Sequence, residues 1–312
     1  MRIVFFGTPE TAVPFLEEAV RGHEVAAVVS QPDKPAGRGL SVAPTPVKKR
    51  ALELGLKVLQ PARPSDAASE LAALNCDLAV VVAYGRILKP DILSAARLGA
   101  INVHFSLLPK YRGAAPVQWA LVHGESRTGV TIFWLDEGMD TGPVQLVRET
   151  QVGPEEDAGA LLARLTRIGT EGLGEALSDI AAGRVLRTPQ SGSPSLAPLI
   201  QKEDGRLSFQ QAAARIHDRV RGLSLWPKTW LELSGAPPRR LGIVKTALGE
   251  GVSSFPPGTI ISVDRSRGIL VQCSDGSRLW VVLVQPEGKK PVPAADFLNG
   301  LRLAPGDPFP AA

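Results

Sequence analysis

Short apolar runs alternate with helical patterns along the first half of the chain. Buried strands are predicted for the runs Arg2 to Phe6, Val25 to Ser30 and Asp77 to Ala83. Helices are predicted between them, over 9–20, 47–54 and 65–74. Because strands and helices alternate at this spacing, we expect right-handed crossovers and a mainly parallel twisted sheet with helices on both faces. The pattern therefore predicts a doubly wound, Rossmann-like α/β domain, which binds ligands at the carboxyl ends of its strands.

Local signals add detail to this domain. Thr8 can cap the first helix, and Pro9 suits its first helical position. Residues 31–46 are rich in Pro and Gly and are predicted to form a loop. A further apolar strand near 129–135 runs into an acidic loop, and a long helix is predicted over 157–183.

The composition changes after the long helix. Residues 188–198 read Thr-Pro-Gln-Ser-Gly-Ser-Pro-Ser-Leu-Ala-Pro, which is typical of a linker. Beyond it the pattern predicts a helix and several short strands, over 209–222, 229–233, 259–263, 269–272 and 279–284. These strands indicate a small barrel or sandwich, and 312 residues exceed what one core usually supports. We therefore predict a first domain over 1–188, a linker over 189–205 and a small β-domain over 206–312.

Hydrophobic residues make up 44% and charged residues 21% of the chain, as in ordinary globular proteins. No apolar run approaches the roughly 18 residues of a membrane span. The start, Met1 to Gly7, reaches glycine before a signal-peptide core develops. Cys76 and Cys273 are the only cysteines and have no CxxC spacing, so neither a disulfide framework nor a zinc site is expected. A cytoplasmic protein that does not enter membranes is predicted.

Charge is distributed unevenly. From Arg206 to the C-terminus there are 14 Lys and Arg against 8 Asp and Glu, a net charge of +6. Residues 1–205 carry 21 against 23, a net charge of −2. A basic domain attached to a near-neutral one indicates that the second part approaches a polyanion. A merely soluble surface would explain the same charges.

Gly7-Thr8-Pro9 stands where a nucleotide-binding fold would carry its phosphate loop. Only one glycine is present, and neither GxGxxG nor GxxxxGK[ST] occurs there, so a strand-to-helix turn is the better interpretation. Asn102 and His104 are two residues apart on an extended run, so their side chains project from one face. On composition alone, such a pair is more often a hydrogen-bonded structural pair than a site.

The loop after the 129–135 run carries Asp136, Glu137 and Asp140. These carboxylates could hold a metal, but supporting histidines or further carboxylates are not nearby. A carboxylate that orients and charges a histidine is the better functional interpretation.

Several motifs together resemble those of the methionyl-tRNA formyltransferases. They are Phe6-Gly7-Thr8-Pro9, Gln31-Pro-Asp-Lys-Pro-Ala-Gly-Arg38-Gly39, Val82-Ala-Tyr-Gly85, Asn102-Val-His104, Ser106-Leu-Leu-Pro109, Tyr111-Arg-Gly-Ala-Ala-Pro116, Asp140-Thr-Gly142, Lys202-Glu-Asp-Gly205 and Trp226-Pro227. The Asn-x-His, Ser-Leu-Leu-Pro and Asp-Thr-Gly motifs alone mark the wider folate-dependent formyltransferase superfamily. The Gln-Pro-Asp loop and the C-terminal domain narrow the resemblance from this superfamily to the methionyl-tRNA formyltransferases.

The resemblance implies a Rossmann-like formyltransferase domain followed by a small β-barrel that is OB-like and lies along tRNA. It implies that Asn102, His104 and Asp140 are catalytic. The folate stretch would be Ser106, Leu107, Leu108 and Pro109, and the loop that carries Lys34 and Arg38 would contact the tRNA acceptor stem. Three positions depart from the family pattern: Leu40-Ser41 follow Arg-Gly where lysines are frequent, Phe105 replaces a glycine, and Pro143 replaces a polar residue. The first departure could shift tRNA binding to Lys48, Lys49 and Arg50.

The implied reaction moves a formyl group from 10-formyltetrahydrofolate to the α-amine of methionyl-initiator tRNA, with no metal. Asn102 and a protonated His104 would stabilise the oxyanion. Asp140 would raise the pKa of the histidine and help to move a proton. A monomer is favoured. Amino-sugar and ribonucleotide formyltransferases, a formate-releasing hydrolase and a non-catalytic RNA-binding protein are the alternatives, although a basic second domain and a catalytic trio fit none of them together.

Overall fold

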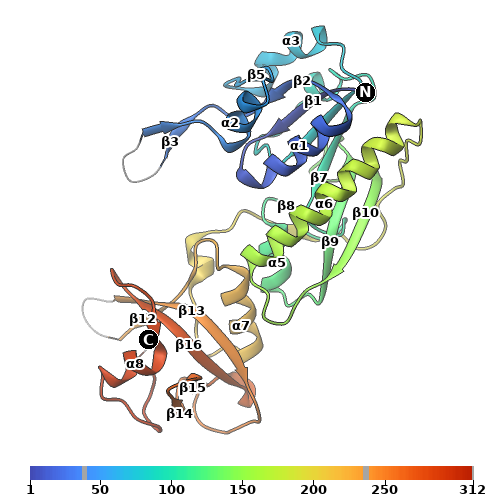
Figure 1. Cartoon of the computed structure of the whole chain (residues 1–312). Coiled ribbons are helices and arrows are strands. Elements are labelled where there is room, and N and C mark those ends of the chain that lie inside the picture. Colours follow the sequence, from blue (N-terminus) through green and yellow to red (C-terminus); the bar gives the residue numbers. More distant parts are fainter. Residues whose placement is uncertain (37–40, 235–238, 311–312) are drawn as a thin grey trace. The chain divides into compact units, whose positions relative to one another are not determined.

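The computed structural model describes residues 1–36, 41–234 and 239–310 (Figure 1). Arg38, predicted to contact tRNA, therefore lies outside the described residues. The chain divides into two compact units. The first unit comprises Met1–Pro116, Arg127–Gln151 and Leu162–Ala197. The second unit comprises Val117–Ser126, Val152–Leu161 and Pro198–Ala312.

A seven-stranded sheet forms the centre of the first unit, in the order β10-β9-β7-β6-β1-β2-β5. Its strands are β1 (Arg2–Gly7), β2 (Glu24–Val29), β5 (Val58–Leu59), β6 (Leu78–Val82), β7 (Ala100–His104), β9 (Arg127–Trp134) and β10 (Val144–Gln151). From β7 to β5 the neighbouring strands are parallel, whereas β9 and β10 pair antiparallel at one edge. The predicted buried strands and the doubly wound fold class are confirmed.

Helices cover both faces of this sheet, as Figure 1 shows. They are α1 (Val13–Gly22), α2 (Pro46–Glu53), α3 (Ala68–Ala73), α4 (Pro90–Leu93) and α6 (Ala158–Ala181), with short 3-10 turns η1 (Glu10–Ala12) and η2 (Pro64–Ala67). Successive side chains of β1 point to opposite faces of the sheet, so each face can bury its side chains under a layer of helices. Val4 and Phe6 belong to the core that Leu71 of α3 and Ile92 of α4 complete. On α6, Gly169 leaves room for the Phe15 ring of α1, which a Cβ there would approach to 3.0 Å.

The start of the first helix differs from the prediction. Thr8 does not cap it: the Thr8 hydroxyl donates a hydrogen bond to the carbonyl oxygen of Tyr84 at 2.9 Å. Pro9 precedes η1 with an extended backbone, and Pro14 takes the first turn of α1. Thr8 thus joins the ends of β1 and β6, a contact between distant segments that local sequence does not reveal.

The predicted loop 31–46 contains a small hairpin of β3 (Lys34–Ala36) and β4 (Ser41–Ala43). The predicted linker is also more ordered than its composition indicates. Its strand β11 (Leu196–Ala197) pairs in parallel with β8 (Arg112–Gly113) of the first unit.

The second unit is built on an antiparallel sheet in the order β12-β13-β16-β15-β14. Its elements are α5 (Pro116–Val122), η3 (Lys202–Gly205), α7 (Ala213–Gly222), β12 (Thr229–Leu233), β13 (Arg239–Gly249), β14 (Ile260–Asp264), β15 (Gly268–Gln272), η4 (Ser274–Gly276), β16 (Arg278–Pro286), β17 (Val292–Pro293) and α8 (Ala294–Asn299). Ile216 and Val220 of α7 pack on this sheet in one core with Leu241 and Val281. The predicted small β-domain is confirmed, whereas β13 and α8 were not predicted.

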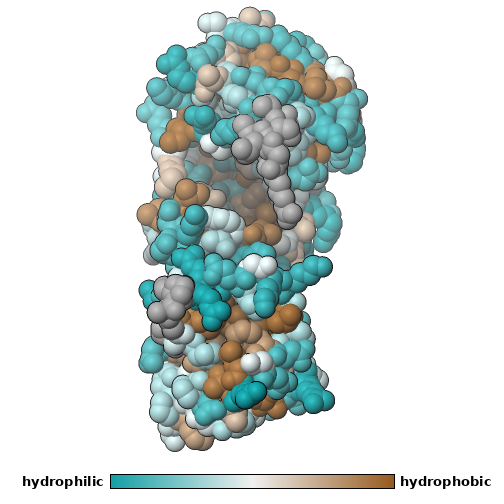
Figure 2. All heavy atoms as spheres, turned by 90° about the vertical axis from the view of Figure 1, so that its left-hand side faces the viewer, coloured by the Kyte–Doolittle hydropathy of each residue, from teal (hydrophilic) through white to brown (hydrophobic). Residues whose placement is uncertain are grey.

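Two further properties concern the surface. None of the helices among the described residues is long and apolar enough to cross a membrane. On the face that Figure 2 presents, small hydrophobic patches lie within a largely hydrophilic surface.

Candidate active site

Two adjoining cavities lie where β6 and β7 end, at the carboxyl edge of the parallel part of the sheet. The larger, about 500 Å³, is lined by Asn102, His104 and Asp140 among others. The smaller, about 280 Å³, shares Asn102 and Asp140 and is otherwise mostly apolar, with Ile87 and Leu88 in its wall. The structure therefore brings together the three residues that the sequence singled out, at the sheet edge where ligands were expected.

Asn102 stands in the middle of β7, between Val81 of β6 and Phe133 of β9. Its side chain is half-buried and faces both cavities. Among the described residues, none forms a hydrogen bond with the Asn102 amide. The amide is thus available to a ligand, and the pair is not the mutually hydrogen-bonded structural pair that composition alone favours.

His104 is buried, and its two ring nitrogens have different neighbours. The Nε2 atom lies 2.8 Å from the carbonyl oxygen of Tyr111, and because a carbonyl only accepts, Nε2 carries the proton. The Nδ1 atom lies 3.6 Å from Oδ2 of Asp140. In the neutral imidazole, Nδ1 is therefore the atom without a proton, and it faces a carboxylate.

Burial lowers the pKa of His104 below its usual value of 6.5, against the opposing effects of the Asp140 charge and of the hydrogen bond to Tyr111. The prediction that a protonated His104 stabilises the oxyanion concerns the reaction, and it stays a prediction. Asp140 does favour the imidazolium, as predicted, but desolvation outweighs it. We therefore describe His104 as neutral at neutral pH, with an imidazolium that Asp140 stabilises once it forms.

Asp140 is held in place by a hydrogen bond from a distant segment of the chain. Its backbone has a φ of 54°, in the left-handed region, and its Oδ2 accepts a hydrogen bond from the Gly113 amide at 2.7 Å. The position of Gly142 requires glycine, because a Cβ there would lie 1.8 Å from the carbonyl oxygen of Trp134. The Asp-Thr-Gly motif is thus explained by a loop that must pass close to the end of β9.

The other carboxylate in this loop that has a defined partner is Asp136. Its Oδ1 accepts from the Thr141 hydroxyl at 2.7 Å and from the Gly138 amide at 3.0 Å, which closes the turn. No group of three His, Cys, Asp or Glu side chains suited to a metal occurs within the described ranges. That the reaction needs no metal stays a prediction.

The predicted folate stretch, Ser106 to Pro109, forms a turn beside the site. The buried Ser106 hydroxyl donates to the carbonyl oxygen of Lys110 at 2.6 Å. Thr131 of β9 donates to the Ser106 carbonyl at 2.7 Å and accepts from the Leu108 amide at 3.2 Å. In the described part of the chain, residues 106–109 line neither of the two cavities. Their folate role stays a prediction.

Comparison with known families and proteins gives a consistent result. The family model described as formyl transferase matches residues 1–177, and the one described as formyl transferase, C-terminal domain, matches residues 199–302. The methionyl-tRNA formyltransferase of Elusimicrobium minutum is 44% identical over 98% of this chain and 99% of its own length. That of Solibacter usitatus is 47% identical over 97% of this chain and 96% of its own. The chain belongs to the methionyl-tRNA formyltransferase family.

A solved structure shares the fold of this family member. It is the N-formyltransferase from Helicobacter canadensis, in complex with folinic acid and dTDP-3-aminofucose. The TM-score is 0.68 at 19% identity, over 89% of this chain and 98% of that protein. At this identity the comparison shows the fold alone.

Sequence reasoning missed residues at the mouth of the cavities. Ile87 is 88% exposed and Met139 is 59% exposed, although both are large and apolar, and both line the two cavities. Exposed apolar side chains beside a polar trio provide a surface for a partly apolar ligand. The sequence did offer one sign of Ile87: it follows the Val82-Ala-Tyr-Gly85 motif, which stands at the end of the most apolar strand.

Phe105, a departure from the family pattern, lies in the wall of the larger cavity. Its ring meets that of Phe15 edge to face, with centroids 6.1 Å apart. The substitution is therefore accommodated by the core beneath the cavity.

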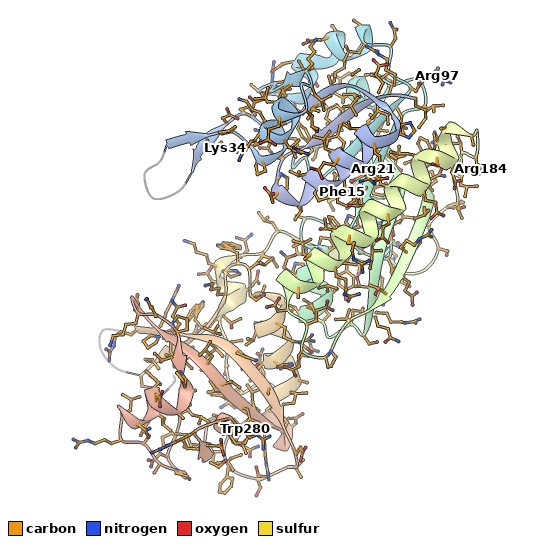
Figure 3. The ribbon with its side chains drawn as sticks, in the orientation of Figure 1. Phe15, Arg21, Lys34, Arg97, Arg184 and Trp280 are labelled. Atoms are coloured by element: carbon orange, nitrogen blue, oxygen red, sulfur yellow. The ribbon has the colours of Figure 1, made fainter. Side chains whose placement is uncertain are left out.

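Lys34, predicted to bind tRNA, is exposed on the β3–β4 hairpin, which extends from the sheet of the first unit (Figures 1 and 3). The base of the hairpin is fixed by Asp33, which accepts from Lys48 Nζ at 2.5 Å and from Gln60 Nε2 at 2.7 Å. These bonds lower the pKa of Asp33. Arg50 pairs with Glu17 and Glu53, so Lys48 and Arg50 are engaged in ion pairs within the fold.

Proposed function

We propose that this chain transfers the formyl group of 10-formyltetrahydrofolate to the α-amine of methionyl-initiator tRNA, in the cytoplasm. The observation that supports this most is the arrangement in the larger cavity. An Asn102 amide with no partner among the described residues lies beside a buried His104 whose unprotonated Nδ1 faces Asp140. Acyl transfer to an amine needs these elements: a donor for an oxyanion, a base for the amine and a charge that stabilises the protonated base.

The chemistry follows from the proton positions. The amine nitrogen attacks the formyl carbon, a new C–N bond forms, and the formyl oxygen becomes an oxyanion that the Asn102 amide stabilises. His104 Nδ1 accepts a proton from the attacking amine, and Asp140 stabilises the resulting imidazolium. When the bond between the formyl carbon and N10 breaks, the imidazolium returns that proton to N10. The products are formylmethionyl-tRNA and tetrahydrofolate, and His104 is neutral again.

The smaller cavity suits the formyl donor. It is mostly apolar, adjoins Asn102 and Asp140, and has Ile87, Leu88 and Leu93 in its wall. A flat ring system could be held there while N10 reaches the trio in the larger cavity. Folinic acid, a formylated folate, in the structure of the fold relative supports a folate-type donor. Residues Ser106 to Pro109 would support the folate site indirectly, because they form the turn next to His104.

The acceptor is proposed to use two basic regions. Lys34 is exposed on the hairpin of the first unit, and Arg38 follows it in the sequence, outside the described residues. Residues 206–312 carry a net charge of +6, and among them the Arg240 guanidinium lies 3.9 Å from the centroid of the Trp230 ring. Cationic side chains next to an aromatic ring suit contact with phosphates and bases.

The test is whether purified protein consumes 10-formyltetrahydrofolate only when methionyl-initiator tRNA is present. We expect tetrahydrofolate and formylmethionyl-tRNA to form in equal amounts. Uncharged tRNA, glycinamide ribonucleotide and an amino-sugar nucleotide serve as controls. Formylation of either small amine in place of the tRNA, or release of formate without an acceptor, would contradict the proposal.

A further inference from the structure

We propose that Gln190 is a positioning residue for this reaction: it holds the Asp140 loop in the geometry that the transfer step requires. The inference rests on the proposed function. Gln190 lies in the stretch predicted to be a linker, and it lines neither of the two cavities in the described structure. It would therefore act through Asp140 and not on the substrates.

The Gln190 side chain uses both ends of its amide. Its Nε2 donates to the carbonyl oxygens of Asp140 and Gly142, at 2.8 and 2.9 Å. Its Oε1 accepts from Arg112 Nη2 at 2.6 Å. One side chain thus satisfies two carbonyls of the Asp-Thr-Gly loop and connects them to the strand β8. Because Asp140 has left-handed backbone geometry, which costs free energy in a non-glycine residue, its conformation depends on such external bonds.

The stretch that carries Gln190 is attached to the first unit at both ends. Before it, Thr188 exchanges two backbone hydrogen bonds with Val144, at 2.7 and 3.1 Å. After it, β11 pairs with β8, and Gly113 makes this approach possible because a Cβ there would lie 2.7 Å from the Ala197 carbonyl. Gln190 is therefore held on a fixed segment and not on a free linker.

The same segment reaches the other partner of His104. The Ser195 hydroxyl accepts a hydrogen bond from the Tyr111 amide at 2.9 Å, and the Tyr111 carbonyl accepts from His104 Nε2. Gln190 holds the backbone of Asp140, whose carboxylate faces Nδ1. The segment 188–197 thus connects to the groups on both sides of the imidazole. We therefore expect a displacement of this segment to change the distance between His104 Nδ1 and Asp140 Oδ2.

The pKa of His104 is a second property that should change when Gln190 is replaced. The charged group that raises the pKa of His104 is Asp140, whereas Tyr111 acts through its backbone carbonyl and burial acts in the opposite direction. Arg112, the charged residue of the adjacent β8, is bonded to Gln190. If Gln190 is removed, the Asp140 loop loses two bonds and its carboxylate is less well held against Nδ1. The pKa of His104 should then fall further.

Two variants separate this role from simple stability. Gln190→Glu keeps the acceptor for Arg112 and removes the two donors, and Gln190→Ala removes both. Gln201→Ala is the matched control, since Gln201 is exposed and donates one bond, to the Leu199 carbonyl. We expect both Gln190 variants to lose about tenfold or more in kcat with nearly unchanged KM values, because a transition-state arrangement is lost. The control should match the wild type.

The deciding measurement is a double-mutant cycle with Asp140→Asn. If Gln190 acts through the Asp140 carboxylate, Gln190→Ala should have little further effect on kcat in the Asp140→Asn background. An equal loss in both backgrounds, or no loss in the wild-type background, would overturn the proposal. NMR titration of His104, one of four histidines, gives an answer that does not depend on turnover. A lower pKa in Gln190→Ala is expected, and an unchanged one would contradict the proposal even if the wild type proved to formylate another amine.

Discussion

His104 Nδ1 lies 3.6 Å from Asp140 Oδ2, while Nε2 of the same ring is committed to the carbonyl oxygen of Tyr111. The separation is longer than a hydrogen bond, as expected for an unprotonated nitrogen facing a carboxylate. The pair is therefore arranged for a charge that appears during the reaction. Asp140 stabilises His104 after it takes a proton, which places the benefit in the transition state and not in the resting protein.

Asp140→Asn should change the pH profile of the reaction. Because the pKa of His104 is already lowered by burial, neutral His104 persists below pH 6.5, and activity should fall only as the pH drops through the lowered pKa. Removing the Asp140 charge removes an effect that raises this pKa. The acidic limb of kcat should therefore move to lower pH, and the plateau should fall because the imidazolium is no longer stabilised. A limb that moves to higher pH would contradict this arrangement.

Asn102→Ala should reduce kcat by about 10² to 10³-fold, the usual loss when one oxyanion donor is removed. The fold should not depend on this side chain, because the Asn102 amide has no hydrogen-bond partner among the described residues. The melting temperature should stay close to that of the wild type. Steady-state kinetics with both substrates varied would decide: a rise in KM with unchanged kcat would mean that Asn102 only binds.

Ser106→Ala distinguishes two roles of the turn at 106–109. The Ser106 hydroxyl is buried and donates a hydrogen bond to the Lys110 carbonyl, and alanine removes this bond. We expect a loss of about 0.5 to 1.5 kcal/mol in the free energy of unfolding, the usual net contribution of one hydrogen bond. Denaturant unfolding measures it, and the KM for the folate should hardly change. If the KM rises while stability is kept, the hydroxyl contacts the folate directly.

The second unit should bind tRNA through phosphates. The logarithm of the affinity should fall linearly with the logarithm of salt concentration. Arg240→Ala should weaken binding to all tRNA sequences alike and reduce the slope by about one if Arg240 meets a phosphate. Filter binding at several salt concentrations measures both. Salt should leave the affinity for the folate nearly unchanged, and a slope unaffected by Arg240→Ala would place this side chain outside the interface.

Much of the fold could be predicted because it depends on local patterns. The runs that became β1, β2 and β6 are nearly all apolar, and β7 shows Asn102 and His104 on one face by alternation alone. That the trio meets was implied by the family motifs and not by the strand order, because β9 runs antiparallel to β7 and ends at Trp134 beside Ile101, near the start of β7. In contrast, β13 has exposed charged residues at its start and Gly242 within it, which weaken the strand pattern.

What could not be predicted depends on contacts between distant segments. The composition of 188–198 is that of a linker, yet its bonds to Asp140, Gly142 and Tyr111 tie it to the site. The pKa of His104 in the resting protein depends on distant segments in the same way. A charged neighbour can be recognised in sequence, whereas burial is the sum of many surrounding residues and outweighs it here.

The central claim is that the buried His104 moves the proton during formyl transfer. Its most direct test is the single-turnover rate of formylmethionyl-tRNA formation by His104→Ala at saturating folate and tRNA, with the melting temperature measured in parallel. We predict a folded protein that loses more than about 100-fold in rate, since general acid–base catalysis contributes about that much or more. A folded variant that retains a rate within about tenfold of the wild type would contradict the account.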